Sequence, residues 1–177
     1  PPATKGYCPS VFALMPKLIE RLGCGTDGSI TGILTVLTEA DDINDPVADS
    51  ARSLLDGHIV LSRKLASRGH YPAIDILSSI SRLMPAVASR QHQAAANKIK
   101  EIYATYADAE DLINIGAFAQ GSNKRIDGSI TLIEHIRNFL IQQAREKTDF
   151  SQTVKMIMEI TDKWDQMLGI DNRKNLQ

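Results

Sequence analysis

Cysteine, aromatic residues and an excess of charge of either sign are all scarce in this sequence. Its 177 residues include two cysteines, 5% aromatic residues and a formal net charge of −1. Cys8 and Cys24 belong to no CxxC motif or Cys/His cluster, so no zinc site or disulfide framework is indicated, and we expect two reduced cytoplasmic thiols. The near-zero net charge gives no basic surface of the kind that nucleic-acid-binding proteins carry. We therefore expect no nucleic-acid partner.

Several motifs that would identify a particular chemistry are also missing. No G-x-x-x-x-G-K-[ST] phosphate loop and no G-x-G-x-x-G fingerprint occurs in the sequence. The histidines lack the spacing of a metal-ligand set, and Ser10 and Ser81 have no paired His and Asp in a catalytic motif order, so no metal site is predicted. No apolar run reaches the roughly 18 residues of a membrane span, and there is no secretion leader. The chain opens on Pro1-Pro2 without Met, which suggests a cleaved product or an excised fragment.

The first half of the sequence has the pattern of an α/β domain. The composition, 43% hydrophobic and 23% charged residues, fits a soluble globular protein with one core, or with one core and a small second lobe. Apolar residues at helical spacing alternate with short β-branched runs, which indicates a parallel sheet covered on both sides. The predicted elements are a helix from Pro9 up to Gly23, a strand at Ser29–Thr38 buried on both faces, a helix at Val47–Leu55, a strand at His58–Leu61 and a helix at Arg63–Arg68.

The second half is predicted to be entirely helical. After Met84-Pro85 and from Ser89 onward no strand pattern occurs, and Gly121-Ser122-Asn123 is predicted to join two helices. We place a domain boundary near residue 88, which gives domains 1–88 and 89–177. The predicted fold class is therefore an α/β partial parallel sheet followed by an all-α helical C-terminal domain. The predicted helices lie near residues 91–106, 109–118, 127–143 and 151–168.

Four segments of the sequence stand out: GYCPSVFALMPKLIER at 6–21, GSITGILTVLTEADDINDP at 28–46, GHIVLSRKLASRGHYPAIDILSSISR at 57–82, and IGAFAQGSNKRID at 115–127 with FLIQ at 139–142. These segments closely resemble the rotary ATPase family, which includes F-type ATP synthases, V-type ATPases and the flagellar and type III secretion ATPases. The last segment is similar to the helical C-terminal domain of the flagellar and type III secretion branch, although this chain has Asn123-Lys124 where that branch usually continues with Asp-Pro. The acidic helical hairpin of F-type β subunits is not found.

The resemblance implies a C-terminal portion of such an ATPase that lacks the Walker A and Walker B segments. Its sheet would be the downstream half of a RecA-like nucleotide-binding domain. The complete protein would be a homohexamer that hydrolyses ATP to drive protein export through a flagellar or type III secretion apparatus. ATP and Mg²⁺ would be held mainly by residues absent from this chain, so we expect the chain alone to be inactive.

The resemblance also implies partners and a location. The partners would be a central stalk coiled-coil protein, a stator or regulator protein, and export chaperone–substrate complexes. The location would be cytoplasmic, peripheral to the membrane export gate at the inner-membrane export apparatus. Two alternatives remain open: a helical docking module for chaperone or stalk proteins, and a catalytic or regulatory subunit of an F-type or V-type proton-translocating ATPase.

Arg82 is the first candidate functional residue. We expect it on a short helix, Ser78–Met84, whose apolar residues face a core and leave the guanidinium free for another direction. From the residues alone, an ordinary surface ion pair is the default. The resemblance to the family's SxSR motif implies instead an arginine supplied to ATP bound by a neighbouring subunit. A guanidinium binds phosphate oxygens bidentately and keeps its charge, and arginine fingers are credited with about 10³–10⁵ in rate.

Tyr71 is the second candidate. Pro72 disfavours helical backbone at Tyr71, so the ring should project from the edge of a loop, where an aromatic face can stack on a purine. The family resemblance implies a contact with adenine. A half-buried tyrosine that covers the sheet is the alternative. Phe139 and Phe150 are possible further walls of such a pocket, but both also suit a core and are not assigned.

The acidic loop that contains Asp41, Asp42 and Asp45 is the third candidate. It lacks the glycine and the glutamate that an EF-hand calcium loop requires, so a solvated acidic loop is the ordinary explanation. The resemblance implies that this loop faces the centre of the hexamer and contacts the stalk protein. Its charge would then steer a basic coiled-coil partner toward the ring.

Overall fold

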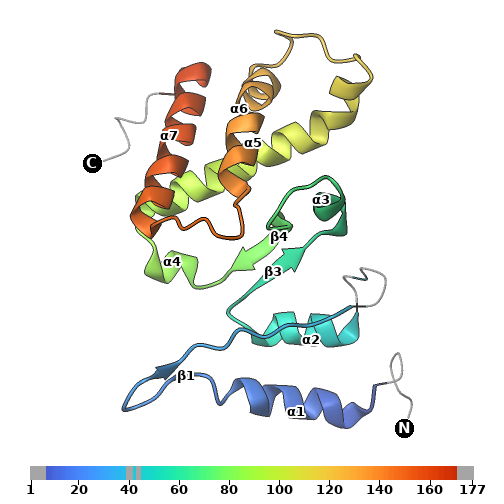
Figure 1. Cartoon of the computed structure of the whole chain (residues 1–177), viewed down its shortest axis with the longest axis vertical. Helices are drawn as coiled ribbons and strands as arrows, with labels where there is room; N and C mark the ends of the chain where they lie inside the picture. The colour runs from blue at the N-terminus through green and yellow to red at the C-terminus, as the bar shows by residue number, and fades with distance from the viewer. Residues whose placement is uncertain (1–6, 39–41, 43–44, 171–177) are drawn as a thin grey trace. The chain divides into compact units, whose positions relative to one another are not determined.

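The computed structural model describes residues 7–38, 42 and 45–170. The chain divides into two compact units, Pro1–His58 and Ile59–Gln177. Among the described residues, no helix is both long and apolar enough to cross a membrane. Figure 1 shows the elements, which in chain order are α1 Pro9–Ile19, β1 Gly23–Cys24, β2 Ser29–Ile30, α2 Pro46–Leu54, β3 Gly57–Leu61, α3 Arg63–Ser67, β4 Ile74–Ser81, α4 Met84–Val87, α5 Arg90–Asn114, α6 Lys124–Leu140 and α7 Phe150–Leu168.

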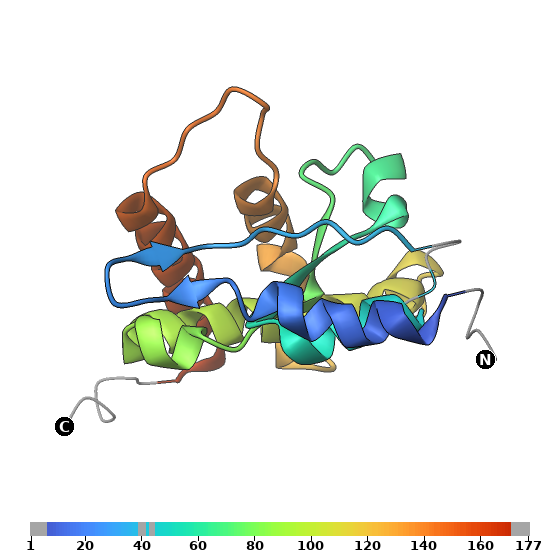
Figure 2. The same ribbon diagram turned by 90° about the horizontal axis from the view of Figure 1, so that it is seen from below.

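The first unit begins with α1 and a short hairpin. Helix α1 starts at Pro9 as predicted, because proline at the first helical position gives up no hydrogen bond and already has a helical φ. Strands β1 and β2 pair antiparallel, with Gly23 opposite Ile30, and the chain then continues without regular structure through residues 31–38 (Figure 2). The predicted strand at Ser29–Thr38 therefore forms only at Ser29–Ile30, and its predicted burial is wrong because both residues are exposed.

The strand ends early because residues 31–38 have no partner strand among the described residues. Their side chains are correspondingly exposed: Ile33 is 93% exposed and Leu37 is 88% exposed. A strand forms only where its N–H and C=O groups find a partner strand. The β-branched residues favour a strand, but composition alone does not show whether a neighbouring strand is available to pair with it.

The second unit begins with a β3–α3–β4 arrangement. Strand β3 and helix α3 are confirmed: the Ser62 hydroxyl accepts a hydrogen bond from the Leu65 amide at 3.4 Å to begin α3, and Gly69 closes the turn with a φ of 74°. Strand β4 was not predicted. The Ser62 amide donates to the Ala73 carbonyl at 2.8 Å, so β3 gives this segment a strand partner that overrides its helical spacing.

The pairing of β3 with β4 also differs from the predicted parallel sheet. The two arrows run in opposite directions in Figure 1. Parallel strands need a crossover long enough to return the chain along the sheet, usually a helix. The helix between them, α3, has five residues and rises only about 7 Å. It is too short to carry the chain back to the start of β3, so β4 runs antiparallel to β3. The strands described here therefore form two-stranded antiparallel ribbons.

The rest of the second unit is a three-helix bundle, α5, α6 and α7 (Figure 1). Its core centres on Trp164, which is 1% exposed and lies against Gly128, where an added Cβ would come within 3.0 Å of the indole ring. The separate helices predicted at 91–106 and 109–118 form one helix, α5, because neither glycine nor proline occurs from Arg90 to Asn114, where the helix ends. The buried core residues are Ala95, Ile99, Ile102, Leu132, Ile136, Ile157, Ile160 and Trp164.

Polar contacts fix the ends and the register of these helices. The Asn123 side chain accepts from the Arg125 amide at 2.9 Å and begins α6. Asparagine and aspartate are equivalent as helix N-caps, so this departure from the usual Asp-Pro keeps the cap. Lys98 on α5 donates to both carboxylate oxygens of the buried Asp165 on α7 at 2.7 and 2.6 Å. The predicted loop at 121–123 is confirmed, whereas the predicted domain boundary near residue 88 stays a prediction.

Candidate functional site

Tyr71 lies in the loop that leads from α3 into β4. Tyr71 is 56% exposed. Its backbone is fixed from the helical bundle: the Tyr71 carbonyl accepts a hydrogen bond from the Gln142 amide, just beyond α6, at 2.9 Å. The loop therefore carries an exposed tyrosine on an anchored main chain.

Arg82 lies at the other end of β4, in the bend between this strand and α4. The predicted helix at Ser78–Met84 is wrong, because the strand runs to Ser81 and the next helix begins at Met84. The side chain of Arg82 is exposed. The Ser81 hydroxyl accepts from the Met84 amide at 3.2 Å and so closes the bend around it.

Strand β4 is locally distorted between Tyr71 and Arg82. The Asp75 carboxylate accepts from the backbone amides of Leu77 and Ser78, at 3.0 and 3.1 Å, which is the hydrogen bonding of an Asx turn. The Ser79 hydroxyl donates to the Asp75 carbonyl at 2.6 Å and accepts from the Val60 amide at 3.0 Å. These bonds fix the position of the end of β4 relative to β3, and Arg82 follows directly after this end.

The acidic loop is described only at Asp42 and Asp45, since Asp41 lies outside the described residues. Asp45 is 5% exposed. Its carboxylate accepts from the amides of Val47 and Ala48 at 2.9 and 3.2 Å, as the N-cap of α2. Sequence reasoning placed the start of this helix at Pro46 but grouped Asp45 with the partner-binding residues, and so missed its role as the N-cap. Asp42, by contrast, is partly exposed.

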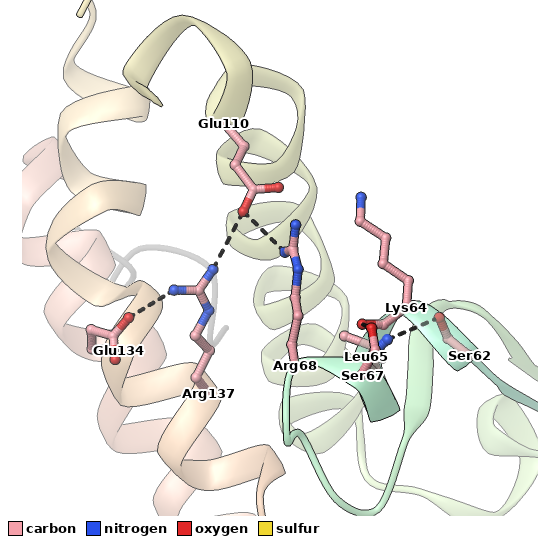
Figure 3. Close-up of polar contacts among 8 residues, drawn as sticks. All are labelled: Ser62, Lys64, Leu65, Ser67, Arg68, Glu110, Glu134 and Arg137. Carbon is pink, nitrogen blue, oxygen red and sulfur yellow. Dashed lines mark hydrogen bonds and ion pairs between the residues drawn. The ribbon is translucent and has the colours of Figure 1, made fainter. Parts of the chain in front are cut away.

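A charged cluster that sequence reasoning missed joins α3 to the bundle (Figure 3). Glu110 on α5 contacts two guanidinium groups, Arg68 at 3.3 Å and Arg137 at 3.7 Å. Arg137 also binds Glu134 at 2.8 Å and lies 5.1 Å from the centre of the Tyr106 ring. Burial opposes the charge of Arg137, but the Glu134 hydrogen bond and Tyr106 outweigh it and raise its pKa. No short-range motif marks this cluster, because its members lie up to 69 residues apart.

His70 is buried beside this cluster. Burial, and secondly the positive charge of Arg137, lower the pKa of His70 below its usual 6.5, so the imidazole is neutral at neutral pH. A surface pocket of about 190 Å³ is lined in part by Arg68, Tyr103 and Arg137. Arg68 and Arg137 are already paired with carboxylates, so the cluster fastens the end of α3 to α5 and α6.

The two phenylalanines left unassigned lie in different settings. Phe139 packs against the bundle core. Phe150 is exposed and meets the His92 ring edge-on, with centroids 5.7 Å apart. In the part of the chain that the structure describes, no group of three or more His, Cys, Asp or Glu residues could hold a metal ion.

Comparisons with known proteins match both halves of the chain. Residues 1–81 match the ATP synthase alpha/beta family, nucleotide-binding domain, and residues 88–159 match the T3SS EscN ATPase C-terminal domain. The chain belongs to the flagellar and type III secretion ATPase family. This confirms the resemblance, and with it the organisation as a nucleotide-binding-domain fragment followed by a helical C-terminal domain.

Individual relatives in this family are similar over most of the chain. The flagellum-specific ATP synthase of Salmonella typhimurium is 51% identical over 89% of this chain and 35% of its own length, and the type 3 secretion system ATPase of Pseudomonas syringae is 48% identical over 88% and 35%. EscN of the enteropathogenic E. coli type III secretion system, solved as an assembled ATPase, is 43% identical, with a TM-score of 0.86 over 90% of this chain and 39% of that one. EscN was also solved in complex with its central stalk EscO, with 41% identity and a TM-score of 0.79 over 88% and 36%. The chain thus spans little more than a third of the curated relatives it matches.

Proposed function

We propose that the complete protein is a ring-forming ATPase that drives protein export through a flagellar or type III secretion apparatus, and that this chain supplies two of its nucleotide contacts. Tyr71 would pack against the adenine of ATP, and Arg82 would reach the ATP held by the neighbouring subunit and stabilise the transition state of phosphoryl transfer there. The proposal is supported by the names of the relatives, all ATPases or ATP synthases of these systems, and by the exposure of both side chains.

The proposal that Tyr71 and Arg82 contact different nucleotides rests on their positions relative to β4. Tyr71 precedes the strand and Arg82 follows it. The two residues therefore lie at opposite ends of one strand, which allows them to contact different nucleotides. In a ring closed by head-to-tail interfaces, each subunit can place its two contacts at two successive nucleotides.

The described residues fit ATP better than they fit Mg²⁺. An exposed tyrosine suits a purine, and an exposed guanidinium suits phosphate oxygens. Mg²⁺ needs carboxylate and phosphate oxygens around it, and the described part of the chain offers no acidic cluster for it. We therefore assign the metal and most phosphate contacts to the remainder of the protein. Arg82 would neutralise the charge that builds up on the transferred phosphoryl group.

The acidic loop supports a second contact, with a coiled-coil stalk protein. EscN, a relative, was solved with its central stalk. Asp42 is partly exposed, whereas the carboxylate of Asp45 is buried as a helix cap, so within this loop we assign stalk attraction to Asp41 and Asp42. A stator or regulator protein and export chaperone–substrate complexes complete the proposed partners, at the cytoplasmic side of the inner-membrane export apparatus.

Arg82→Ala in the complete protein tests the catalytic assignment. We expect ATP binding close to normal and turnover reduced by at least about 10³, because only the charged transition state loses its partner. Arg82→Lys is the matched control and should recover little, since an ammonium does not reproduce the bidentate fork. The measurements are steady-state ATP hydrolysis and equilibrium binding of a fluorescent ATP analogue. Unchanged turnover in Arg82→Ala would remove this residue from the mechanism.

A further inference from the structure

The main chain on either side of Arg82 is held by side chains from one helix, α5. Lys100 donates from Nζ to the Ser79 carbonyl at 2.8 Å, three residues before Arg82. Gln93 donates from Nε2 to the Ala88 carbonyl at 2.7 Å and to the Pro85 carbonyl at 3.2 Å. These bonds bracket the segment that carries the arginine.

The spacing of the two donors matches this arrangement. Residues 93 and 100 are seven apart, close to two helical turns, so both side chains lie on the same face of α5. Between the two attachment points the segment makes one bend, closed by Ser81 onto Met84, and one short helix, α4. A segment that is fixed at both ends and closed in the middle has few alternative conformations.

We propose that Lys100 and Gln93 are positioning residues for Arg82, and that α5 sets the place at which the guanidinium meets the neighbouring subunit's nucleotide. This rests on the function proposed for Arg82. The Arg82 guanidinium would accelerate phosphoryl transfer only when it is held in the productive geometry. A misplacement of about 1 Å can lower a rate by about 10². Lys100 contributes the stronger tether, because a hydrogen bond from a charged donor is stronger than one from a neutral amide.

The contacts of Ser79 indicate that loss of Lys100 would have a local effect. The Ser79 hydroxyl is held by Val60 and Asp75 independently of its carbonyl. Removing the Lys100 donor therefore leaves β4 attached to β3, and frees only the carbonyl that leads into the bend at Arg82. The expected defect is in the placement of Arg82 and not in the pairing of the strands.

The test uses the complete protein, assembled as a ring, with Lys100→Met. Methionine keeps an unbranched side chain of similar length and removes the ammonium donor. We expect kcat to fall about tenfold or more while KM for ATP changes by less than about threefold, because the lost contact acts in the transition state. The matched control is Lys98→Met with Asp165→Met, which replaces the α5–α7 ion pair by apolar side chains and should leave kcat within about twofold. Gln93→Leu removes the contacts on the other side of Arg82 and should likewise lower kcat with little change in KM. It replaces the first test if the Lys100 variant does not assemble.

A double-mutant comparison separates positioning from a general structural effect. In an Arg82→Ala background, Lys100→Met should lower kcat no further, because residues that act as a unit are not additive. A further drop of the same size in that background, or an unchanged kcat with Arg82 present, would overturn the positioning role. If Arg82→Ala itself leaves turnover intact, the failure lies with the proposed function of Arg82; if only Lys100→Met and Gln93→Leu are silent, the failure lies with the positioning alone.

Discussion

The bundle of α5, α6 and α7 and the segment of residues 29–38 use similar apolar residues with opposite results. In the bundle, isoleucines, leucines and Trp164 are buried against one another. In residues 29–38, Ile33 and Leu37 are almost fully exposed. A helix satisfies its own backbone and needs only a partner for its apolar stripe, whereas a strand needs a neighbour for the backbone as well. The bundle finds its partners within the chain, whereas in the segment 29–38 only Ser29–Ile30 find a partner strand among the described residues.

The largest effect on stability should separate these two regions. Trp164→Ala should lower the free energy of unfolding by about 3–5 kcal/mol, because it empties the centre of the bundle. Ile33→Ala should change it by less than about 0.5 kcal/mol in this chain, since its side chain is exposed. Urea unfolding of the 177-residue chain measures both. Equal effects would mean that residue 33 is buried in solution and that the comparison is wrong.

A smaller effect should distinguish the two described aspartates of the acidic loop. Asp45→Ala removes the cap of α2 and should cost about 1 kcal/mol of stability. Asp42→Lys, combined with Asp41→Lys, should leave the unfolding midpoint close to that of the original chain and weaken association of the complete protein with its stalk partner in a salt-dependent way. Thermal unfolding and a binding titration at two salt concentrations check these outcomes. Stalk binding that is indifferent to the double reversal would count against the charge-steering role.

The smallest effect should be a pH dependence at His70. Its pKa is lowered in the folded state by burial and by Arg137, so the unfolded chain binds the proton more readily. The contribution of the neutral imidazole to stability is therefore complete above about pH 6.5 and is lost as the pH falls below that value. His70→Asn should flatten this part of the stability profile, as measured by urea midpoints between pH 5 and pH 8. An unchanged slope would contradict the assignment to His70.

Most of the elements and the family could be predicted from the sequence. Pro9, the Ser62 cap, Gly69 and the apolar spacing of the bundle helices act locally, so their effects are visible in short windows. The segments that mark the family are likewise contiguous in the chain, and the match to known flagellar and type III secretion ATPases follows them.

What sequence reasoning missed depends on distant partners. Strand β4 forms because β3 pairs with it, and the residues around Arg82 have helical spacing that this pairing overrides. The bonds from Lys100 and Gln93 to the carbonyls around Arg82, and the cluster of Glu110 with its two arginines, join segments that no motif relates. Asp45 is an exception, because the signal for its role as N-cap, an aspartate directly before the predicted helix start at Pro46, is local and was overlooked in favour of its charge.

The most direct test of the central claim mixes two inactive versions of the complete protein in one ring. One version carries Arg82→Ala, and the other carries a substitution of the phosphate-loop lysine in the part of the protein outside this chain. If each site combines one subunit's phosphate-binding groups with the next subunit's Arg82, equal mixing should restore about one quarter of the sites. Co-purification through two different tags verifies that the rings are mixed. Recovery of ATP hydrolysis in verified mixed rings is the predicted result, and no recovery at any mixing ratio would contradict it.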